Sequence, residues 1–160
     1  MGVHRPVASV VSALCLVMLV LGGFLGVSAA EEKPVVVCTT TVLASVVRDL
    51  AGDQVVVEVV SSPAVCPAHY DVTPSDVEKF RHAALIFMHG FEPWVEELRE
   101  ASGSQAPVIK ISGPWGVPEM LKAKYEAVAA GLEENLGIDV SESLETVSYT
   151  HLTLPTTERV

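Results

Sequence analysis

The sequence predicts an α/β fold, with a parallel four-stranded sheet flanked by helices. Short β-branched runs alternate with segments whose apolar residues recur at helical spacing, across residues 31–146. Capping or turn residues stand between these segments, and no internal repeat is visible. Because strictly alternating strands and helices require right-handed crossovers, we expect parallel strands and a sheet covered on both faces.

The first strand and helix are marked by a change of pattern within residues 34–52. Residues 34–38 (PVVVC) form a β-branched run typical of a buried strand. The threonines at 39–41 offer a helix N-cap, and apolar residues then recur at helical spacing as far as Leu50. Gly52 stands where helices commonly end. The next β-branched run, residues 55–60, predicts the second strand.

The helix-capping signals are stronger after the second predicted strand than before it. Residues 73–76 (TPSD) supply a capping hydroxyl, a proline for the first helical position and an acid in the first turn, which is typical of a helix start. A third strand is predicted at 84–88, a helix at 92–101 and a fourth strand at 108–111. Apolar residues at helical spacing over 121–136 predict a longer amphipathic helix.

The first thirty residues differ from the rest. Arg5 precedes 21 residues without a charge, 7–27, and small residues follow at 28–30. This pattern predicts a signal peptide over residues 1–30, its cleavage, and a periplasmic or extracytoplasmic location. An uncleaved membrane anchor is the alternative, because 21 apolar residues can span a bilayer.

The C-terminal residues 147–160 also stand apart. They read VSYTHLTLPTTERV and show neither helical nor alternating apolar spacing. The stretch SYTHLTLPTT resembles a translated sequencing adapter. We therefore expect a non-native tail here, with an ordinary disordered tail as the alternative, and we leave it out of the predicted fold.

Composition narrows the classes of function. Ten Lys and Arg against twenty Asp and Glu give a net charge of −10, which argues against nucleic acid or an anionic membrane surface as the main partner. An apolar content of 49% excludes intrinsic disorder. No GxGxxG, Walker or GxSxG motif is present, so nucleotide-binding and hydrolase functions lack their motifs.

The candidate site lies in the loops after the strands, because ligands of parallel sheets bind beyond the carboxyl ends of the strands. His69 and Asp71 follow the second strand, and His89 ends the third, so we expect them at the same edge. Imidazole and carboxylate groups are suitable ligands for a borderline divalent metal. The sequence therefore suggests a metal site of His69, His89 and Asp71, although histidines of this kind are also common in ordinary surface loops and strand ends.

Cys38 and Cys66 are the cysteines that follow the signal peptide. An even pair in an exported chain suggests a disulfide, and both residues are expected at the carboxyl edge of neighbouring strands. The alternative is that Cys66 supplies a thiolate to the metal.

Three blocks carry a family resemblance: residues 35–60, residues 66–87 (CPAHYDVTPSDVEKFRHAALIF) and residues 89–98 (HGFEPWVEEL). They resemble the N-terminal lobe of the substrate-binding proteins of zinc and manganese ABC transporters, the cluster that includes ZnuA and TroA. The resemblance implies one lobe of a bilobed metal-binding protein, here truncated, whose lobes are joined by one long helix. The predicted helix from Glu119 to Leu136 would be near the start of that helix or just before it. It also implies a metal held between the lobes and docking on a membrane permease.

The resemblance is not complete at the ligand positions. The first metal histidine of the family aligns with Ala68, one residue before His69, and the second aligns with Gly113. His89 falls where the family often has asparagine. The ligand set therefore stays open.

We expect an exported solute-binding protein, not an enzyme, that captures zinc or manganese for an ABC permease. The metal is the transported ligand; we expect no organic cofactor, no nucleic-acid partner, and a monomer when the protein is full length. The alternatives are the same fold with a different solute, or an exported metal- or thiol-dependent enzyme.

Overall fold

The computed structural model describes residues 32–115 and 118–152. The expected signal peptide, residues 1–30, lies outside these residues. The chain separates into a unit that ends at Glu32 and a unit that begins at Lys33, and the second unit carries the fold. No helix in the described part is long and apolar enough to cross a membrane.

The described unit contains a four-stranded parallel sheet, which confirms the predicted fold class. The strands lie in the order β2-β1-β3-β4. Cys38 at the end of β1 pairs with Val59 on one side and with Phe87 on the other, so the strands finish at a common edge. The strand bounds are β1 Val35–Cys38, β2 Val56–Val59, β3 Leu85–Met88 and β4 Val108–Lys110.

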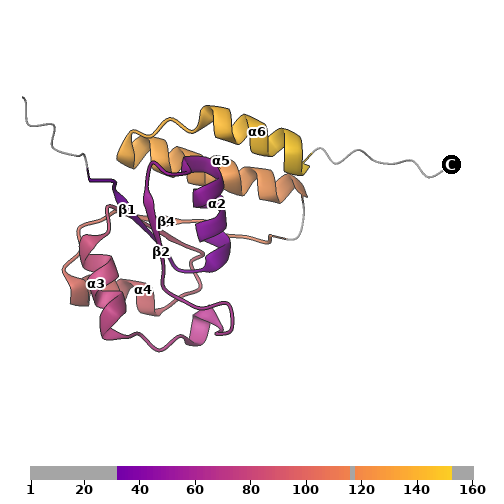
Figure 1. Ribbon diagram of the computed structural model, residues 1–160. Coiled ribbons are helices and arrows are strands. Elements are labelled where there is room, and N and C mark those ends of the chain that lie inside the picture. The colour runs from indigo at the N-terminus through magenta and orange to yellow at the C-terminus, as the bar shows by residue number, and fades with distance from the viewer. Residues whose placement is uncertain (1–31, 116–117, 153–160) are drawn as a thin grey trace, which may run out of the picture. The chain divides into compact units, whose positions relative to one another are not determined.

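Helices cover both faces of the sheet (Figure 1). Helices α2, α5 and α6 pack on one face, and α3 and α4 pack on the other. The helix bounds are α2 Thr41–Ala51, the short 3-10 helix η1 Pro67–His69, α3 Pro74–His82, α4 Trp94–Ser102, α5 Pro118–Leu136 and α6 Ser141–Leu152. All the predicted helices are present, with ends shifted by a few residues.

Strand β1 lies at the centre of two hydrophobic cores. Val36 and Cys38 belong to the core beneath α2, α5 and α6, whereas Val37 belongs to the core beneath α3 and α4. All three are fully buried. Because successive side chains of a strand point to opposite faces, a continuous apolar run is what a sheet covered on both sides requires.

The predicted caps are formed. The hydroxyl of Thr40 accepts a hydrogen bond of 3.4 Å from the backbone N–H of Leu43 at the start of α2. Thr73 and Asp76 form a reciprocal capping box at the start of α3, with Pro74 at the first helical position. These caps fix where the loops at the carboxyl edge end and the helices begin.

The C-terminal region differs from the expectation. The absence of helical spacing from Val147 predicts no helix there, but α6 continues as far as Leu152. Packing explains the difference, because Val147 is buried in the core that α2 and α5 share. The non-native origin of residues 147–160 stays a prediction.

Candidate binding site at the carboxyl edge of the sheet

The loops that follow all four strands meet in one cavity of about 450 Å³. This is the edge at which the sequence predicts a site. The loop after β1 contributes Thr40, and the loop after β3 contributes His89 and Phe91. The loop after β2 contributes residues between Ser61 and Pro67, and the loop after β4 contributes Gly113 and Trp115.

His89 is the one predicted ligand that lines this cavity. Its side chain is buried, and its Nε2 lies 2.8 Å from the hydroxyl oxygen of Thr40. The ring stacks on Phe91 at 5.2 Å and meets the edge of Trp115 at 5.3 Å.

The environment of His89 keeps its imidazole neutral. Burial lowers the pKa of His89, and the charge of Lys124 lowers it further, against the opposing effects of Glu92 and of a hydrogen bond with the backbone of Ile111. The neutral ring is the form that binds metals. The ring nevertheless already makes hydrogen bonds with the Thr40 hydroxyl and with the backbone of Ile111.

Glu92 holds the loop that carries His89. Its side chain is 3% exposed, and it accepts hydrogen bonds from the Thr39 hydroxyl and from the backbone N–H groups of His89, Gly90 and Phe91. Burial alone would raise the pKa of Glu92, but these hydrogen bonds outweigh it and the pKa lies below its ordinary value. Glu92 is therefore a charged carboxylate whose oxygens already serve four donors.

The buried ammonium group of Lys124 lies close to Trp115 and Gly113, two residues of the cavity wall. Lys124 is 5% exposed, donates to the carbonyl oxygen of Ser112, and lies 5.1 Å from the centre of the Trp115 ring. The indole Nε1 of Trp115 is buried and has no hydrogen-bond partner among the described residues.

Gly113 occupies the position that the family resemblance assigns to a histidine. Its φ of +97° disfavours any side chain, and a Cβ added there would lie 3.3 Å from Nζ of Lys124. The local backbone and Lys124 together oppose a histidine at this position.

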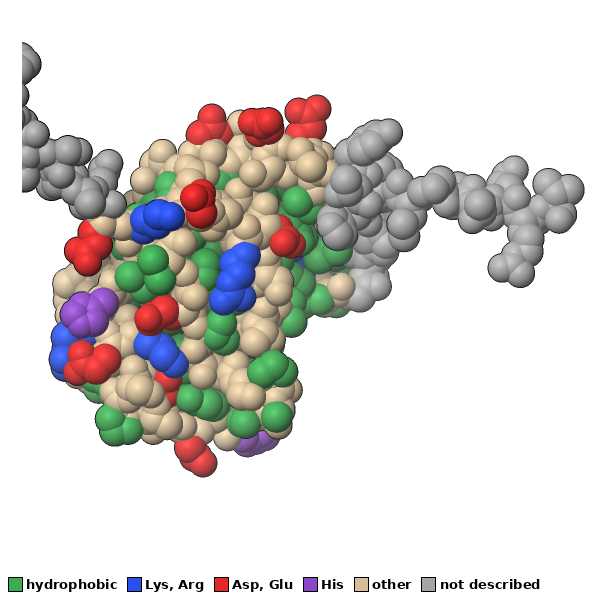
Figure 2. Space-filling view, in the orientation of Figure 1, with side chains coloured by type: hydrophobic (Ala, Val, Ile, Leu, Met, Phe, Trp, Pro, Cys, Tyr) green, Lys and Arg blue, Asp and Glu red, His purple; other side chains and the backbone are tan. Residues whose placement is uncertain are grey.

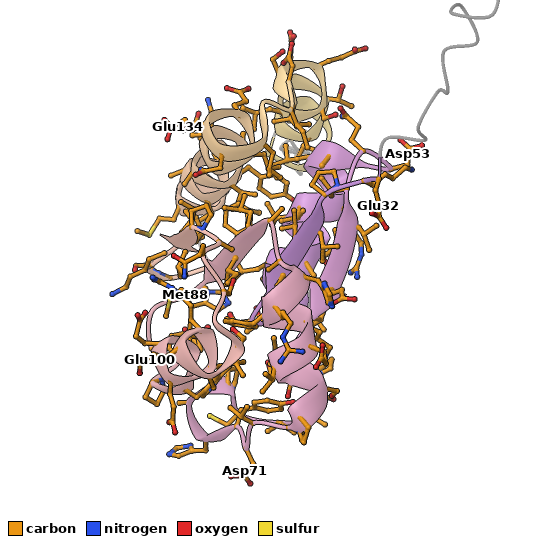
Figure 3. The ribbon with its side chains drawn as sticks, turned by 90° about the vertical axis from the view of Figure 1, so that its left-hand side faces the viewer. Glu32, Asp53, Asp71, Met88, Glu100 and Glu134 are labelled. Atoms are coloured by element: carbon orange, nitrogen blue, oxygen red, sulfur yellow. The ribbon has the colours of Figure 1, made fainter. Side chains whose placement is uncertain are left out.

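The structure does not assemble His69, Asp71 and His89 into one site. His69 is exposed in η1 and does not line the cavity that holds His89. Asp71 lines a separate cavity of about 320 Å³ beside Tyr70 and Trp94, and Figure 3 shows it well apart from Met88 at the end of β3. Within residues 32–115 and 118–152, no group of three His, Cys, Asp or Glu side chains is placed to hold a metal.

The reason for the separation lies in the loop after β2. The Trp94 indole donates a 2.6 Å hydrogen bond to the carbonyl oxygen of Pro67, and Tyr70 packs on the Trp94 ring and donates to Asp76. These contacts fix the segment around His69 against α3 and α4. Pro67 lines the cavity that holds His89, whereas His69 and Asp71 do not.

The expected disulfide is not formed. Both cysteines are free, with Cys38 buried and Cys66 exposed. Cys38 points into the core beneath α2, where burial raises the pKa of its thiol to about 12. Cys66 lies in the exposed loop after β2, so the two thiols are in different environments.

Thr40, Ser61 and Lys124 are cavity or near-cavity residues that the sequence did not single out. Thr40 was expected only as a helix cap, and it has both roles. Ser61 directly follows β2 and donates a 2.6 Å hydrogen bond to the carbonyl of Thr39. Its place at a strand end was a usable signal. Lys124 had no such signal in the sequence, because only the fold brings α5 next to Trp115.

A parallel sheet with one shared cavity at its carboxyl edge defines a ligand-binding α/β lobe. Comparison with known families identifies the family to which this lobe belongs. Residues 36–142 match the family model of ZnuA, the zinc-uptake complex component A, periplasmic, and the chain belongs to this family. The family resemblance of the sequence is thereby confirmed.

Relatives and solved structures agree with this assignment. The chain is 30% identical over 82 residues to the metal ABC transporter substrate-binding lipoprotein SloC of Streptococcus mutans, covering 51% of this chain and 27% of SloC. It is 29% identical over 104 residues to the iron-binding protein YfeA of Yersinia pestis, covering 64% of this chain and 33% of YfeA. The chain thus spans a third or less of these relatives.

The periplasmic zinc-binding protein TroA of Treponema pallidum has the same fold. The match has a TM-score of 0.61 at 20% identity and covers 76% of this chain and 50% of that of TroA.

Proposed function

We propose that this protein is an exported solute-binding protein that captures a divalent transition metal, zinc or manganese, and delivers it to an ABC permease. Membership of the ZnuA family supports this function. SloC is named as the substrate-binding component of a metal ABC transporter, and TroA and YfeA are named for binding zinc and iron. We further propose that residues 1–30 direct export and are removed, and that the complete protein is a monomer.

The observation that carries the proposal is the cavity in which the four carboxyl-edge loops meet, with His89 in its wall. A neutral imidazole binds a metal without first losing a proton. Because Nε2 of His89 is 2.8 Å from the Thr40 hydroxyl, a metal bound there would displace that hydroxyl. His69 remains a proposed second ligand, since Pro67 of the same short helix reaches the cavity.

Calorimetric titration with zinc and with manganese tests the proposal. We expect His89→Ala to weaken zinc binding at least tenfold and His69→Ala to weaken it less. His82→Ala is the matched control, because His82 is an exposed histidine on α3 beside Glu78. Unchanged zinc affinity in both the His69→Ala and the His89→Ala variants would exclude these two residues as metal ligands.

A different solute in the same fold is the second candidate. Two observations favour it: the ring of His89 is already engaged by Thr40 and by the backbone of Ile111, and Gly113 stands at the position of the family's second histidine. No measurable zinc or manganese binding in the titration would support this candidate over metal capture.

The exported-enzyme alternative rests on Cys66, His69 and Asp71. The described structure gives it less support, because Asp71 lines the cavity beside Trp94 and Cys66 is exposed.

A further inference from the structure

A second cavity, of about 400 Å³, lies between helix α5 and the end of strand β4. We call it the α5 cavity. It shares no lining residue with the cavity that holds His89. The residues that α5 contributes are three or four positions apart and therefore lie on one face of the helix. The wall consists of Lys110, Ile111 and Ser112 on the side of β4 and of Met120, Ala123, Lys124 and Ala127 on the side of α5.

The two lysines of the α5 cavity, Lys110 and Lys124, have no carboxylate partner among the described residues. Figure 2 shows the ordinary arrangement on one face of the molecule, where blue basic side chains are interspersed with red carboxylates. The net charge of −10 makes carboxylates abundant, so two lysines without one in the same cavity are unexpected. Each of the other lysines pairs with an acid: Lys33 with Asp53, Lys79 with Asp76 and Lys122 with Glu126.

Lys124 carries a buried charge that the described residues do not neutralise. Its side chain is 5% exposed. An ammonium group has three N–H donors, and the backbone carbonyl of Ser112 accepts one of them. The ring of Trp115, whose centre is 5.1 Å from Nζ, offers a weaker attraction. Because burying a charge without a counter-charge is costly, an anion in the α5 cavity would stabilise this lysine.

Lys110 is exposed, but its carbon chain is held in place by Gly90. Gly90 has a φ of +94°, and a Cβ added there would overlap Cε of Lys110. The stem of the lysine therefore packs directly on the Gly90 backbone, which limits the positions that its ammonium can reach. A side chain that is already ordered loses less conformational entropy when a ligand binds.

The rest of the wall is mainly hydrocarbon, from Ile111, Met120, Ala123 and Ala127. The volume of about 400 Å³ lies within the range of roughly 300–1,000 Å³ typical of sites for small organic molecules. Both ammonium groups repel a cation, and an inorganic oxyanion would leave the apolar wall without a contact. The α5 cavity is therefore suited to a molecule that has carboxylates and a short carbon skeleton.

We propose that the α5 cavity binds a small organic dicarboxylate. Its carboxylates lie toward the ammonium groups of Lys110 and Lys124, and its carbon skeleton contacts Met120 and Ala123. A lysine attracts a carboxylate as a point charge, so the site needs no fixed bidentate geometry. This inference goes beyond metal capture and does not depend on it, because the α5 cavity and the cavity that holds His89 have different walls.

Calorimetry on the purified protein in metal-free buffer tests this inference with succinate, succinamide and inorganic phosphate. Succinamide has the carbon skeleton of succinate without the charge, and phosphate has the charge without the skeleton. We expect succinate to bind at least tenfold more tightly than either of the others. Succinamide or phosphate binding as tightly as succinate, or no binding of succinate, would overturn the inference. The zinc titration described above tests the proposed function separately.

Variants of the two lysines test the contacts. We expect Lys110→Met and Lys124→Met each to weaken succinate binding at least fivefold, because methionine keeps much of the carbon chain and removes the charge. Lys122→Met is the matched control, since Lys122 lies on α5 outside this cavity with its side chain 55% exposed beside Glu126. Circular dichroism establishes folding, and if Lys124→Met does not fold, Lys110→Met decides. Wild-type affinity for succinate in the folded variants would overturn the inference.

Discussion

The hydroxyl of Thr39 donates a 2.6 Å hydrogen bond to Oε1 of Glu92, which lies 53 positions further along the chain. The same carboxylate accepts from the backbone N–H of His89 at 3.1 Å and from that of Gly90 at 2.7 Å. Glu92 therefore ties the end of β1 to the loop after β3. Both of these loops contribute to the wall of the cavity, so the shape of the cavity depends on Glu92 although Glu92 does not line it.

Replacing Glu92 with glutamine should destabilise the fold. The amide removes the charge and turns an NH₂ group toward buried donors, so we expect a loss of about 2 kcal/mol in the free energy of unfolding. Urea denaturation monitored by circular dichroism measures it. Glu96→Gln is the control, because the Glu96 side chain on α4 is 76% exposed and its change should stay within about 0.5 kcal/mol. Equal effects of the two substitutions would contradict this role of Glu92.

Glu92 and Asp76 also predict how stability depends on pH. For both groups burial opposes the charge, yet hydrogen bonds outweigh it, from Thr39 and backbone N–H groups at Glu92 and from Thr73 and Lys79 at Asp76. The folded-state pKa is thus below the ordinary values of 4.5 and 3.8. A lowered pKa means that the unfolded chain takes up protons first as pH falls. Their contribution is therefore complete above these ordinary values and is lost as pH falls below them.

The acid dependence is measured by the urea midpoint between neutral and strongly acidic pH. The wild-type midpoint should fall steeply below about pH 4.5, the ordinary pKa of the glutamate, as these two carboxylates gain protons. In the double variant Asp76→Asn, Glu92→Gln the fall should be shallower, since neither group titrates. An identical slope for both proteins would show that other carboxylates govern acid unfolding.

The fold was predictable because its signals are local. The β-branched run ending at Cys38, the threonine cap at Thr40 and the capping box from Thr73 to Asp76 each depend on neighbours in the sequence, and all are present in the structure. The edge at which the loops meet followed from strand alternation alone. The end of α6 was not predictable in this way, because burial of Val147 against α2 and α5 stabilises that helix, and its spacing gives no signal.

The site was predicted less well because its contacts are long-range. His89 lies at the edge that strand alternation predicts, but its hydrogen bond with Thr40 joins residues 49 positions apart and depends on strand order. Asp71 is two residues from His69 in sequence, yet the Trp94–Pro67 hydrogen bond directs this loop toward α4. Closeness in sequence predicts which residues share a loop, but it does not predict which cavity each of them lines.

The two cysteines should differ sharply in reactivity. Cys66 is exposed, whereas Cys38 is fully buried and burial raises the pKa of its thiol to about 12, so only Cys66 presents an accessible thiol in the folded protein. We expect iodoacetamide to alkylate Cys66 within minutes and Cys38 only in urea, as read by peptide mass spectrometry. Cys66→Ser is the control that should abolish the rapid reaction. A Cys38–Cys66 peptide recovered from protein purified without reductant would contradict the free thiols and restore the disulfide.

Gly131 marks a close approach between α5 and the sheet. A Cβ added there would lie 2.9 Å from Cε1 and 3.0 Å from Cζ of Phe87, a fully buried ring on β3. Alanine normally stabilises a helix interior by about 1 kcal/mol over glycine, but overpacking a core costs about 1–3 kcal/mol. We therefore expect Gly131→Ala to lower the free energy of unfolding by about 1 kcal/mol, measured by urea denaturation. Adding Phe87→Leu to the Gly131→Ala variant should recover part of this loss, because leucine replaces the ring that the new Cβ contacts. A Gly131→Ala protein more stable than the wild type would mean that α5 does not pack this closely on β3.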